Sequence, residues 1–262
     1  MTEFRVNGLV IFDREIGEND KLLTVLSEKY GKLFIIAKGV KSMKNRNMCC
    51  SHIFSYASFV IRKKGNYYYL VDSDLIENFF SVRNDILKLS LASYFCDVVN
   101  HIAQEGVGED ALLRLTLNSI YALSIDKYEL EHIRAAFQLR TVAEIGMAPD
   151  IRSCSSCGKE ENISGYLDLV DGITVCNECR DKINFAIEEN PFFERGMQKP
   201  IALLNPSVIE AIKYIVNSDI KKFLSFSLEP DDYQLLYDLS EKFLTNQLER
   251  TFYSLSFYKS LM

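Results

Sequence analysis

The chain has 262 residues, of which 48% are hydrophobic and 25% are charged, as is typical of a globular protein with a sizeable core. No apolar run approaches the roughly 18 residues that a membrane-spanning helix needs, and the amino terminus lacks the features of a signal peptide. Four of the seven cysteines belong to a metal-binding motif described below, and the other three, Cys49, Cys50 and Cys96, are an odd number with one adjacent pair and form a poor disulfide framework. We therefore expect a soluble protein of one to three domains, without a membrane partner, in a reducing cytoplasm.

The formal net charge of −6 alone argues against a nucleic-acid partner, but the charges are unevenly distributed. Residues 1–80 contain 12 Lys and Arg against 9 Asp and Glu, whereas residues 81–262 contain 18 against 27. Within the first part, the segment from Lys29 to Val71 contains nine basic residues and no acidic one. This segregation predicts a basic face on one domain of an otherwise acidic protein.

Residues 1–80 consist of short runs of Val, Ile, Phe, Tyr and Leu that are separated by turn-forming residues. The runs predict β-strands at Phe4–Phe12, Lys21–Leu26, Lys32–Ala37, Ile53–Arg62, Tyr67–Val71 and Leu75–Phe80. Short strands at this spacing favour a small barrel that closes its own edges. The OB-fold, a five-stranded Greek-key barrel, fits the number of runs.

The loop after the third predicted strand is the candidate nucleic-acid contact. It carries four cations from Lys38 to Arg46, and a flexible cationic loop can follow a phosphate backbone. Aromatic side chains lie beside further cations on the neighbouring hairpin, as in proteins that stack unpaired bases. The candidate DNA-binding cations are Lys32, Lys38, Lys41, Lys44, Arg46, Arg62, Lys63 and Lys64, and the candidate stacking residues are Tyr56, Phe59, Tyr67, Tyr68 and Tyr69. Alternatively, strand aromatics form the barrel core and Lys63–Asn66 is a solvated hairpin tip.

From Asp85 onward apolar residues recur every three to four positions, which predicts helices. The expected helices follow Asp85, span Asp110–Leu123 and Tyr128–Ile145, run from Asn205-Pro206 to about Asn217, and run from Glu229-Pro230 to about Tyr253. The chain is thus expected to continue as an all-α domain after residue 80.

The most specific motif lies between two of these helices. Cys154-x2-Cys157 is followed after eighteen residues by Cys176-x2-Cys179, which is the spacing of a four-thiolate zinc site. Gly158 can adopt the positive φ that such a turn tends to need. Between the pairs, Asp171-Gly172 predicts a hairpin of two short strands. Because four thiolates leave no open coordination position, we expect one structural Zn²⁺; the alternative is four incidental or buried cysteines.

These elements predict an α+β multidomain fold. It consists of an N-terminal OB-fold β-barrel at 1–80, followed by an all-α domain at 81–262 that is interrupted by an inserted four-cysteine zinc ribbon at about 150–182. No phosphate-binding loop, nucleophile elbow or dinucleotide-binding glycine motif is present in the sequence. Of the three histidines, His101 and His132 lie on predicted helices, where a structural role is favoured over catalysis. We therefore expect a protein that is not an enzyme, with no catalytic residue.

Two stretches resemble the signatures of one protein family. Gly17–Lys41 resembles the amino-terminal signature of the RecO family of bacterial DNA repair and recombination mediators, and Phe137–Asp150, leading into Cys154–Gly158, is similar to its second signature. The resemblance covers residues 1 to about 185. It implies binding of single- and double-stranded DNA, strand annealing without nucleotide hydrolysis, and a complex with RecR. It also implies contact with the acidic C-terminal tail of single-strand binding protein, so that the recombinase can load on coated DNA.

We therefore hypothesise a DNA-repair mediator, cytoplasmic and nucleoid-associated when active, whose segment from Lys29 to Val71 binds DNA phosphates and whose helical part docks proteins. A zinc-ribbon transcription or translation adaptor is one alternative, but the ribbon segment Cys154–Arg180 contains two basic residues against five acidic ones. A metal-dependent nuclease is another. Its carboxylates would come from Asp72–Asp74 or Glu229–Asp232, which turn and cap roles also explain.

Overall fold

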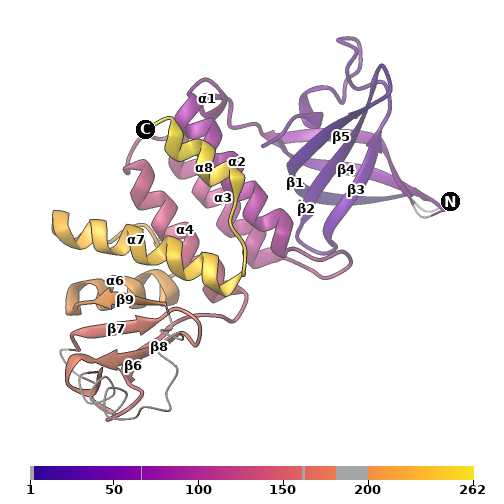
Figure 1. The fold of residues 1–262 in the computed structure, drawn as a ribbon. Helices are drawn as coiled ribbons and strands as arrows, with labels where there is room; N and C mark the ends of the chain where they lie inside the picture. The colour runs from indigo at the N-terminus through magenta and orange to yellow at the C-terminus, as the bar shows by residue number, and fades with distance from the viewer. Residues whose placement is uncertain (1–2, 66, 161–162, 181–199) are drawn as a thin grey trace. The chain divides into compact units, whose positions relative to one another are not determined.

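The computed structural model describes residues 3–65, 67–160, 163–180 and 200–262 (Figure 1). The chain forms two compact units, one of Met1–Lys127 with Phe252–Met262 and one of Tyr128–Thr251. The domain division that the sequence predicts at residue 80 stays a prediction. Among the described residues, every helix is too short or too polar to cross a bilayer.

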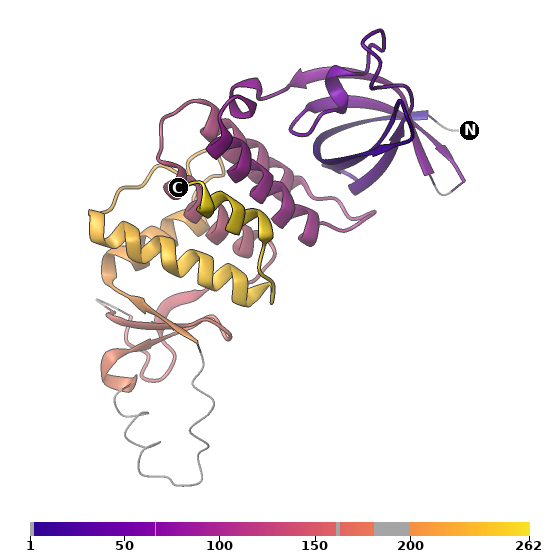
Figure 2. The same ribbon diagram turned by 45° about the horizontal axis from the view of Figure 1, so that its top comes forward.

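The first unit contains the expected five-stranded barrel, whose strands curve into a closed sheet (Figure 2). Its strands are β1 (Glu3–Ile16), β2 (Asp20–Ser27), β3 (Gly31–Ala37), β4 (Tyr56–Lys64) and β5 (Tyr67–Glu77). They pair in the order β1-β2-β3-β5-β4, and β4 closes on β1. The β3–β5 pairing is parallel and the others are antiparallel. The predicted OB-fold is thus confirmed.

Two details of the barrel differ from the prediction. Leu75–Phe80 is not a separate strand, because β5 runs without a break through Asp72 and Asp74, which pair with Val60 and Ser58 of β4. Acidic side chains are tolerated there since they point outward, where Asp74 forms an ion pair with Arg5. Phe59 is fully buried in the barrel core and is unable to stack on a base.

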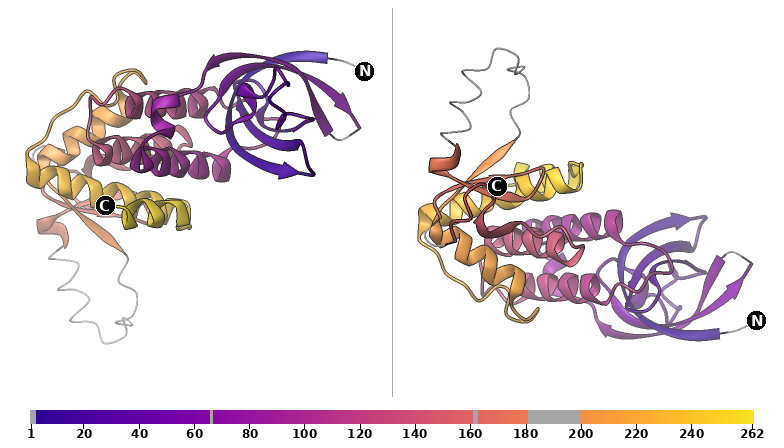
Figure 3. Two further views of the ribbon diagram at one scale, coloured as in Figure 1. Left: turned by 90° about the horizontal axis from the view of Figure 1, so that it is seen from above. Right: turned by 90° about the horizontal axis from the view of Figure 1, so that it is seen from below.

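Helices α1 (Phe80–Arg83), α2 (Ile86–Ile102), α3 (Asp110–Ser124) and α8 (Tyr253–Ser260) complete the first unit. Asp85 caps α2, because its carboxylate accepts hydrogen bonds from the amides of Leu87 and Lys88. The last helix, α8, packs along α2 (Figure 3). Just before it, Phe252 is buried with its ring edge-on to Tyr94 at a centroid distance of 5.8 Å.

The second unit joins three helices to a small sheet. Its elements are α4 (Leu130–Glu144), β6 (Asp150–Cys154), β7 (Gly165–Asp168), β8 (Ile173–Cys176), β9 (Ile201–Leu204), α6 (Pro206–Asn217) and α7 (Pro230–Gln247). The predicted hairpin is present as β7 and β8, and β6 and β9 extend it to a sheet of order β6-β8-β7-β9. Helix α4, which precedes the ribbon, packs on α6 and α7, which follow it. The ribbon is therefore an insertion between packed helices, as predicted.

One signature residue explains part of this packing. Arg140 on α4 donates hydrogen bonds from Nη1 to the carbonyl oxygens of Ile215, Val216 and Ser218, at 3.0, 2.7 and 2.8 Å. These carbonyls lie at the carboxyl end of α6, where backbone acceptors lack helical partners. A positive charge there also complements the helix dipole. Arg140 thus fixes α6 onto α4.

The predicted last helix is too long. Helix α7 ends at Gln247, rather than at about Tyr253, and Glu249 follows with a φ of +49°. A positive φ is unfavourable for a residue with a side chain and does not occur inside a helix. The apolar stripe continues across this break, which is why the sequence pattern alone predicted one helix.

Candidate nucleic-acid interface and metal centre

The predicted cationic loop follows β3 and is anchored to the turn between β1 and β2. The Gly39 amide donates to Asp20 Oδ1 at 2.8 Å, and the Lys41 amide donates to the Asn19 carbonyl at 3.2 Å. Within the loop, Asn45 Nδ2 donates to the Lys38 carbonyl at 3.2 Å. Asp20 and Gly39 belong to the amino-terminal signature. The signature therefore includes the residues that hold the loop in place as well as its cations.

Three predicted cations are paired with acids that lie outside the acid-free segment. Lys41 Nζ lies 2.8 Å from Glu15 Oε2 on β1, and Arg46 lies 2.9 Å from Asp72 Oδ2 on β5. Arg62 pairs with Glu3 on β1. The hydrogen bond from Lys41 lowers the pKa of Glu15 below its usual value. The segment is thus free of acids in sequence but not in space, because barrel closure brings β1 and β5 beside it.

These pairs do not prevent binding of a phosphate. Exposed ion pairs contribute only about 0–1 kcal/mol, so a polyanion can compete with the carboxylate at small cost. The Arg46 side chain is 73% exposed even while it is paired. Lys32 differs, because its half-buried ammonium donates to the Asn100 carbonyl at 2.7 Å and is held beside α2.

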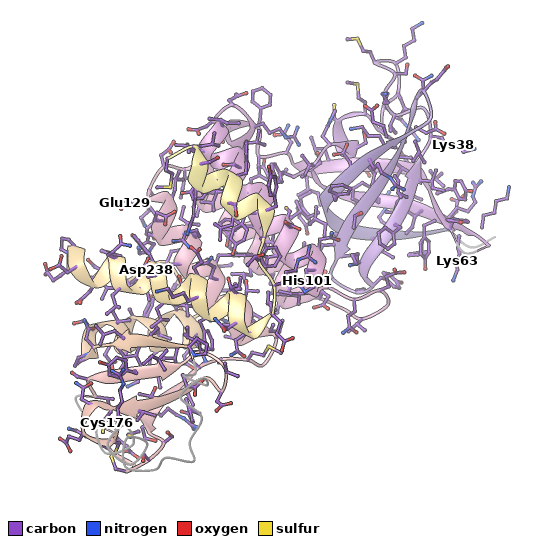
Figure 4. The ribbon with its side chains drawn as sticks, viewed as in Figure 1. Lys38, Lys63, His101, Glu129, Cys176 and Asp238 are labelled. Carbon is purple, nitrogen blue, oxygen red and sulfur yellow. The ribbon has the colours of Figure 1, made fainter. Side chains whose placement is uncertain are left out.

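Four predicted lysines are exposed and form no ion pair within the described residues; they are Lys38, Lys44, Lys63 and Lys64. Lys38 Nζ lies 5.8 Å from the ring centroid of Tyr69, and Lys63 Nζ lies 5.7 Å from that of Tyr68. Lys38 and Lys63 both lie on the barrel, as Figure 4 shows. Such cation–π contacts place positive charge beside an aromatic ring.

The remaining candidate aromatics are accessible to different degrees. Tyr67 is 60% exposed, while Tyr56, Tyr68 and Tyr69 are half-buried. Sequence reasoning missed two other aromatics, Phe12 and Phe34, which project outward from β1 and β3. The alternation of side chains in β3 could have predicted the position of Phe34. Leu33, Ile35 and Ala37 point inward, so the residues between them point outward.

The ribbon brings the four predicted cysteines together, at the end of the second unit where Cys176 is labelled in Figure 4. Cys154 and Cys176 end β6 and β8, and Cys157 and Cys179 follow them. All four sulfur atoms lie within 4.8 Å of one another, and Cys157 Sγ is 3.8 Å from Cys176 Sγ. Thiolates bound tetrahedrally at about 2.3 Å from zinc are about 3.8 Å apart. The geometry therefore fits a four-coordinate metal site.

The local backbone prepares this site for anionic ligands. Gly158 adopts the expected positive φ of +74°, which lets its amide donate to the Cys154 carbonyl at 2.8 Å. Burial alone would raise the pKa of Cys154, but hydrogen bonds from the amides of Cys176, Cys157 and Ser156 outweigh burial and lower the pKa to about 6. Side-chain hydrogen bonds with Cys157 and Cys176 raise the pKa of Cys179 to about 12. A cation would stabilise all four thiolates together.

Comparison with known proteins gives consistent matches along the chain. Family models described as "Recombination protein O N terminal" and "Recombination protein O C terminal" match residues 1–79 and 83–190. The chain is 29% identical over 262 residues to a DNA repair protein RecO of Acetivibrio thermocellus, covering 100% of this chain and 98% of that protein. It is 26% identical to the protein of the same name in Alkaliphilus metalliredigens, with 98% and 99% covered. A third, in a Thermoanaerobacter species, is 27% identical, with 100% and 99% covered.

Proposed function

This chain belongs to the RecO family of DNA repair proteins, which are mediators rather than catalytic enzymes, and we propose that it binds both single- and double-stranded DNA and anneals complementary strands. With RecR, it helps to load the recombinase onto DNA that is coated by single-strand binding protein. It acts in the cytoplasm, on the nucleoid. The barrel supplies the DNA contact, and the helical part docks RecR and the C-terminal tail of single-strand binding protein.

The single observation that supports the DNA contact is a set of exposed lysines on an OB-type barrel, which form no ion pair with any residue that the structure describes. Lys38 and Lys44 lie in or next to the loop after β3, and Lys63 and Lys64 lie at the end of β4. Each is exposed, so it can neutralise a phosphate and release a counterion without breaking an ion pair within the described residues. Oligonucleotide binding through strands and loops of one side is the usual mode of this barrel type.

The cysteine site supports this function indirectly. We propose that Cys154, Cys157, Cys176 and Cys179 hold one Zn²⁺, which links β6 to β8 and stabilises the ribbon. A closed set of four thiolates suits a structural ion. Bound zinc would stabilise the ribbon by cross-linking it, and the chain's own contribution is to hold four sulfur atoms within 4.8 Å of one another.

The DNA contact is tested by removing the unpaired charges. We expect Lys38→Ala, Lys44→Ala and Lys63→Ala, combined, to weaken oligonucleotide binding, measured by fluorescence anisotropy at several salt concentrations. Each phosphate that is no longer neutralised should reduce the slope of log K against log salt by roughly 0.7 to 0.9, so the combined variant should reduce it by about 2 to 3. A second variant, Lys41→Ala with Arg46→Ala, should have a smaller effect because its carboxylate partners already compete.

The matched control removes three exposed lysines from the second unit, Lys221, Lys222 and Lys242. It should leave both affinity and slope unchanged. If the barrel variant and the control bind DNA with the same affinity and the same salt slope, these barrel lysines do not contact DNA. Annealing of oligonucleotides coated by single-strand binding protein, with and without the chain, tests the mediator role separately.

A further inference from the structure

The outer face of the barrel carries a row of three residues that crosses three strands. Thr24 on β2 lies opposite Phe12 on β1 and opposite Phe34 on β3. Directly opposed residues in antiparallel strands project from the same face of the sheet. The rings are 52% and 37% exposed, whereas Thr24 is 5% exposed. Both phenyl rings and Thr24 line one groove, over strands that lie side by side in Figure 1.

The spacing of the strands that carry the two rings suits a flat aromatic ligand. Neighbouring strands are about 4.8 Å apart, so β1 and β3 are separated by roughly 10 Å across β2. Stacked rings have centroids about 4.5–7 Å apart, so one ring can contact two others that are roughly 9–14 Å apart. The groove is open to solvent and has a volume of about 340 Å³, enough for one heterocyclic base. Neither phenyl ring stacks on another aromatic ring within the described residues.

Positive charge lines the same groove. Arg14 and Lys32 are among its lining residues, together with Leu22 and Asn100, and no carboxylate is found among them. Within the part of the chain that the structure describes, Arg14 forms no ion pair. Lys32 uses one N–H on the Asn100 carbonyl, which leaves its other donors available. An aromatic slot between cations is complementary to a nucleotide, which joins a flat ring to an anion.

We propose that Phe12 and Phe34 form a stacking slot for one unpaired base of single-stranded DNA, with Arg14 and Lys32 on the adjoining phosphates. The proposal rests on the proposed DNA binding and deepens it. In a duplex, both faces of each base are covered by neighbouring bases, so the slot accepts only single strands. It thereby gives the barrel a means to distinguish single from double strands, which the phosphate contacts alone lack.

Because the chain contains no tryptophan, a single Trp substitution in the slot gives a fluorescence signal from that position alone. Phe34→Trp places the only indole in the groove, and addition of a single-stranded oligonucleotide should quench its fluorescence through stacking. The matched control, Tyr121→Trp, replaces a 55% exposed aromatic on α3 and should not be quenched. Equal quenching in both proteins, or none at Trp introduced at position 34 while anisotropy shows binding, would overturn the slot.

Affinity gives an independent readout. Phe12→Leu with Phe34→Leu keeps apolar side chains but removes both rings, so the barrel should fold normally by circular dichroism. We expect single-stranded binding to weaken by about tenfold, with duplex binding and the salt slope unchanged. Equal loss for duplex would refute the slot. Failure of the unaltered chain to bind any DNA would instead refute the proposed function itself. Quenching by an acidic peptide but not by DNA would reassign the groove to a protein partner.

Discussion

Gly31 shows how a single signature residue attaches the barrel to the helices of its unit. It has a φ of +59°, and a Cβ built on it would lie 2.2 Å from the carbonyl oxygens of Gln104 and Val107. The next amide, that of Lys32, donates to the same Gln104 carbonyl at 2.9 Å. Any side chain at this position would push the loop between α2 and α3 off the barrel.

We therefore expect Gly31→Ala to lower the free energy of unfolding by about 3 kcal/mol, from overpacking against rigid backbone and from the unfavourable φ. Gly17→Ala is the matched control, because Gly17 has a φ of +74° with no atom within 4 Å of the added Cβ. It should cost only about 1 kcal/mol. Chemical denaturation measures both. Equal losses would show that the close approach does not matter.

For single residues, the sequence predicts which side chains can bind a metal or a phosphate better than it predicts which neighbours those side chains contact. The cysteine spacing predicted the assembly of the four sulfur atoms correctly, because each pair is local in sequence: a turn follows Cys154, and a helical segment that starts at Asn177 follows Cys176. The partners of Lys41, Arg46 and Arg62 could not be predicted, since their carboxylates lie on strands that only barrel closure brings near. The inward position of Phe59 and the outward position of Phe34 follow from strand register, which a list of aromatic residues does not contain.

Among the elements, caps and tight turns were predictable and longer pairings were not. Asn205 accepts a hydrogen bond from the Val208 amide and Pro206 opens α6, as the Asn-Pro pair indicates. Gly172 forms the predicted hairpin turn with a φ of +67°. Segments β6 and β9, by contrast, are strands only because they pair with the two strands of the hairpin, β6 with β8 and β9 with β7. Four-residue segments such as Ile201–Leu204 carry too little periodicity to be recognised alone.

The ribbon provides a prediction about metal and stability together. We expect the purified chain to contain one zinc ion per molecule, and Cys154→Ser or Cys176→Ser to lose it. Since metal binding free energy is folding free energy for such a site, the second unit of either variant should melt at a lower temperature that added zinc does not restore. Elemental analysis and calorimetry measure the two effects.

Cys49→Ser, at an exposed cysteine away from the site, is the control and should keep both zinc and stability. Stoichiometric zinc in both ligand variants would disprove the ligand assignment.

The whole molecule is organised differently from the order of its sequence. Its final segment, Phe252–Met262, belongs to the compact unit of the barrel, whereas Tyr128–Thr251 forms the other unit. Phe252, Leu255 and Tyr258 are buried, and the Ser254 hydroxyl donates to Asp97 of α2 at 2.7 Å. The first unit is therefore complete only after the segment Phe252–Met262, which follows the second unit in the chain, has been synthesised. Hydrophobic periodicity in the sequence could not predict this arrangement, because it indicates which face of a helix is apolar but not which other element packs against that face.

This arrangement predicts that a change in the last helix destabilises the first unit selectively. Tyr258 is fully buried, and Tyr258→Ala should cost about 3–5 kcal/mol by analogy with other large aromatic truncations in cores. Tyr253→Ala, on the same helix but at a side chain that is 85% exposed, should cost almost nothing. Hydrogen exchange read by mass spectrometry would separate the units. Amides of α2 should exchange faster in Tyr258→Ala while those of α4 keep their protection, because α2 belongs to the same compact unit as α8 and α4 belongs to the other. Equal loss of protection in α2 and α4 would mean that the two units unfold as one, and unchanged α2 protection would mean that α8 adds nothing to the first unit.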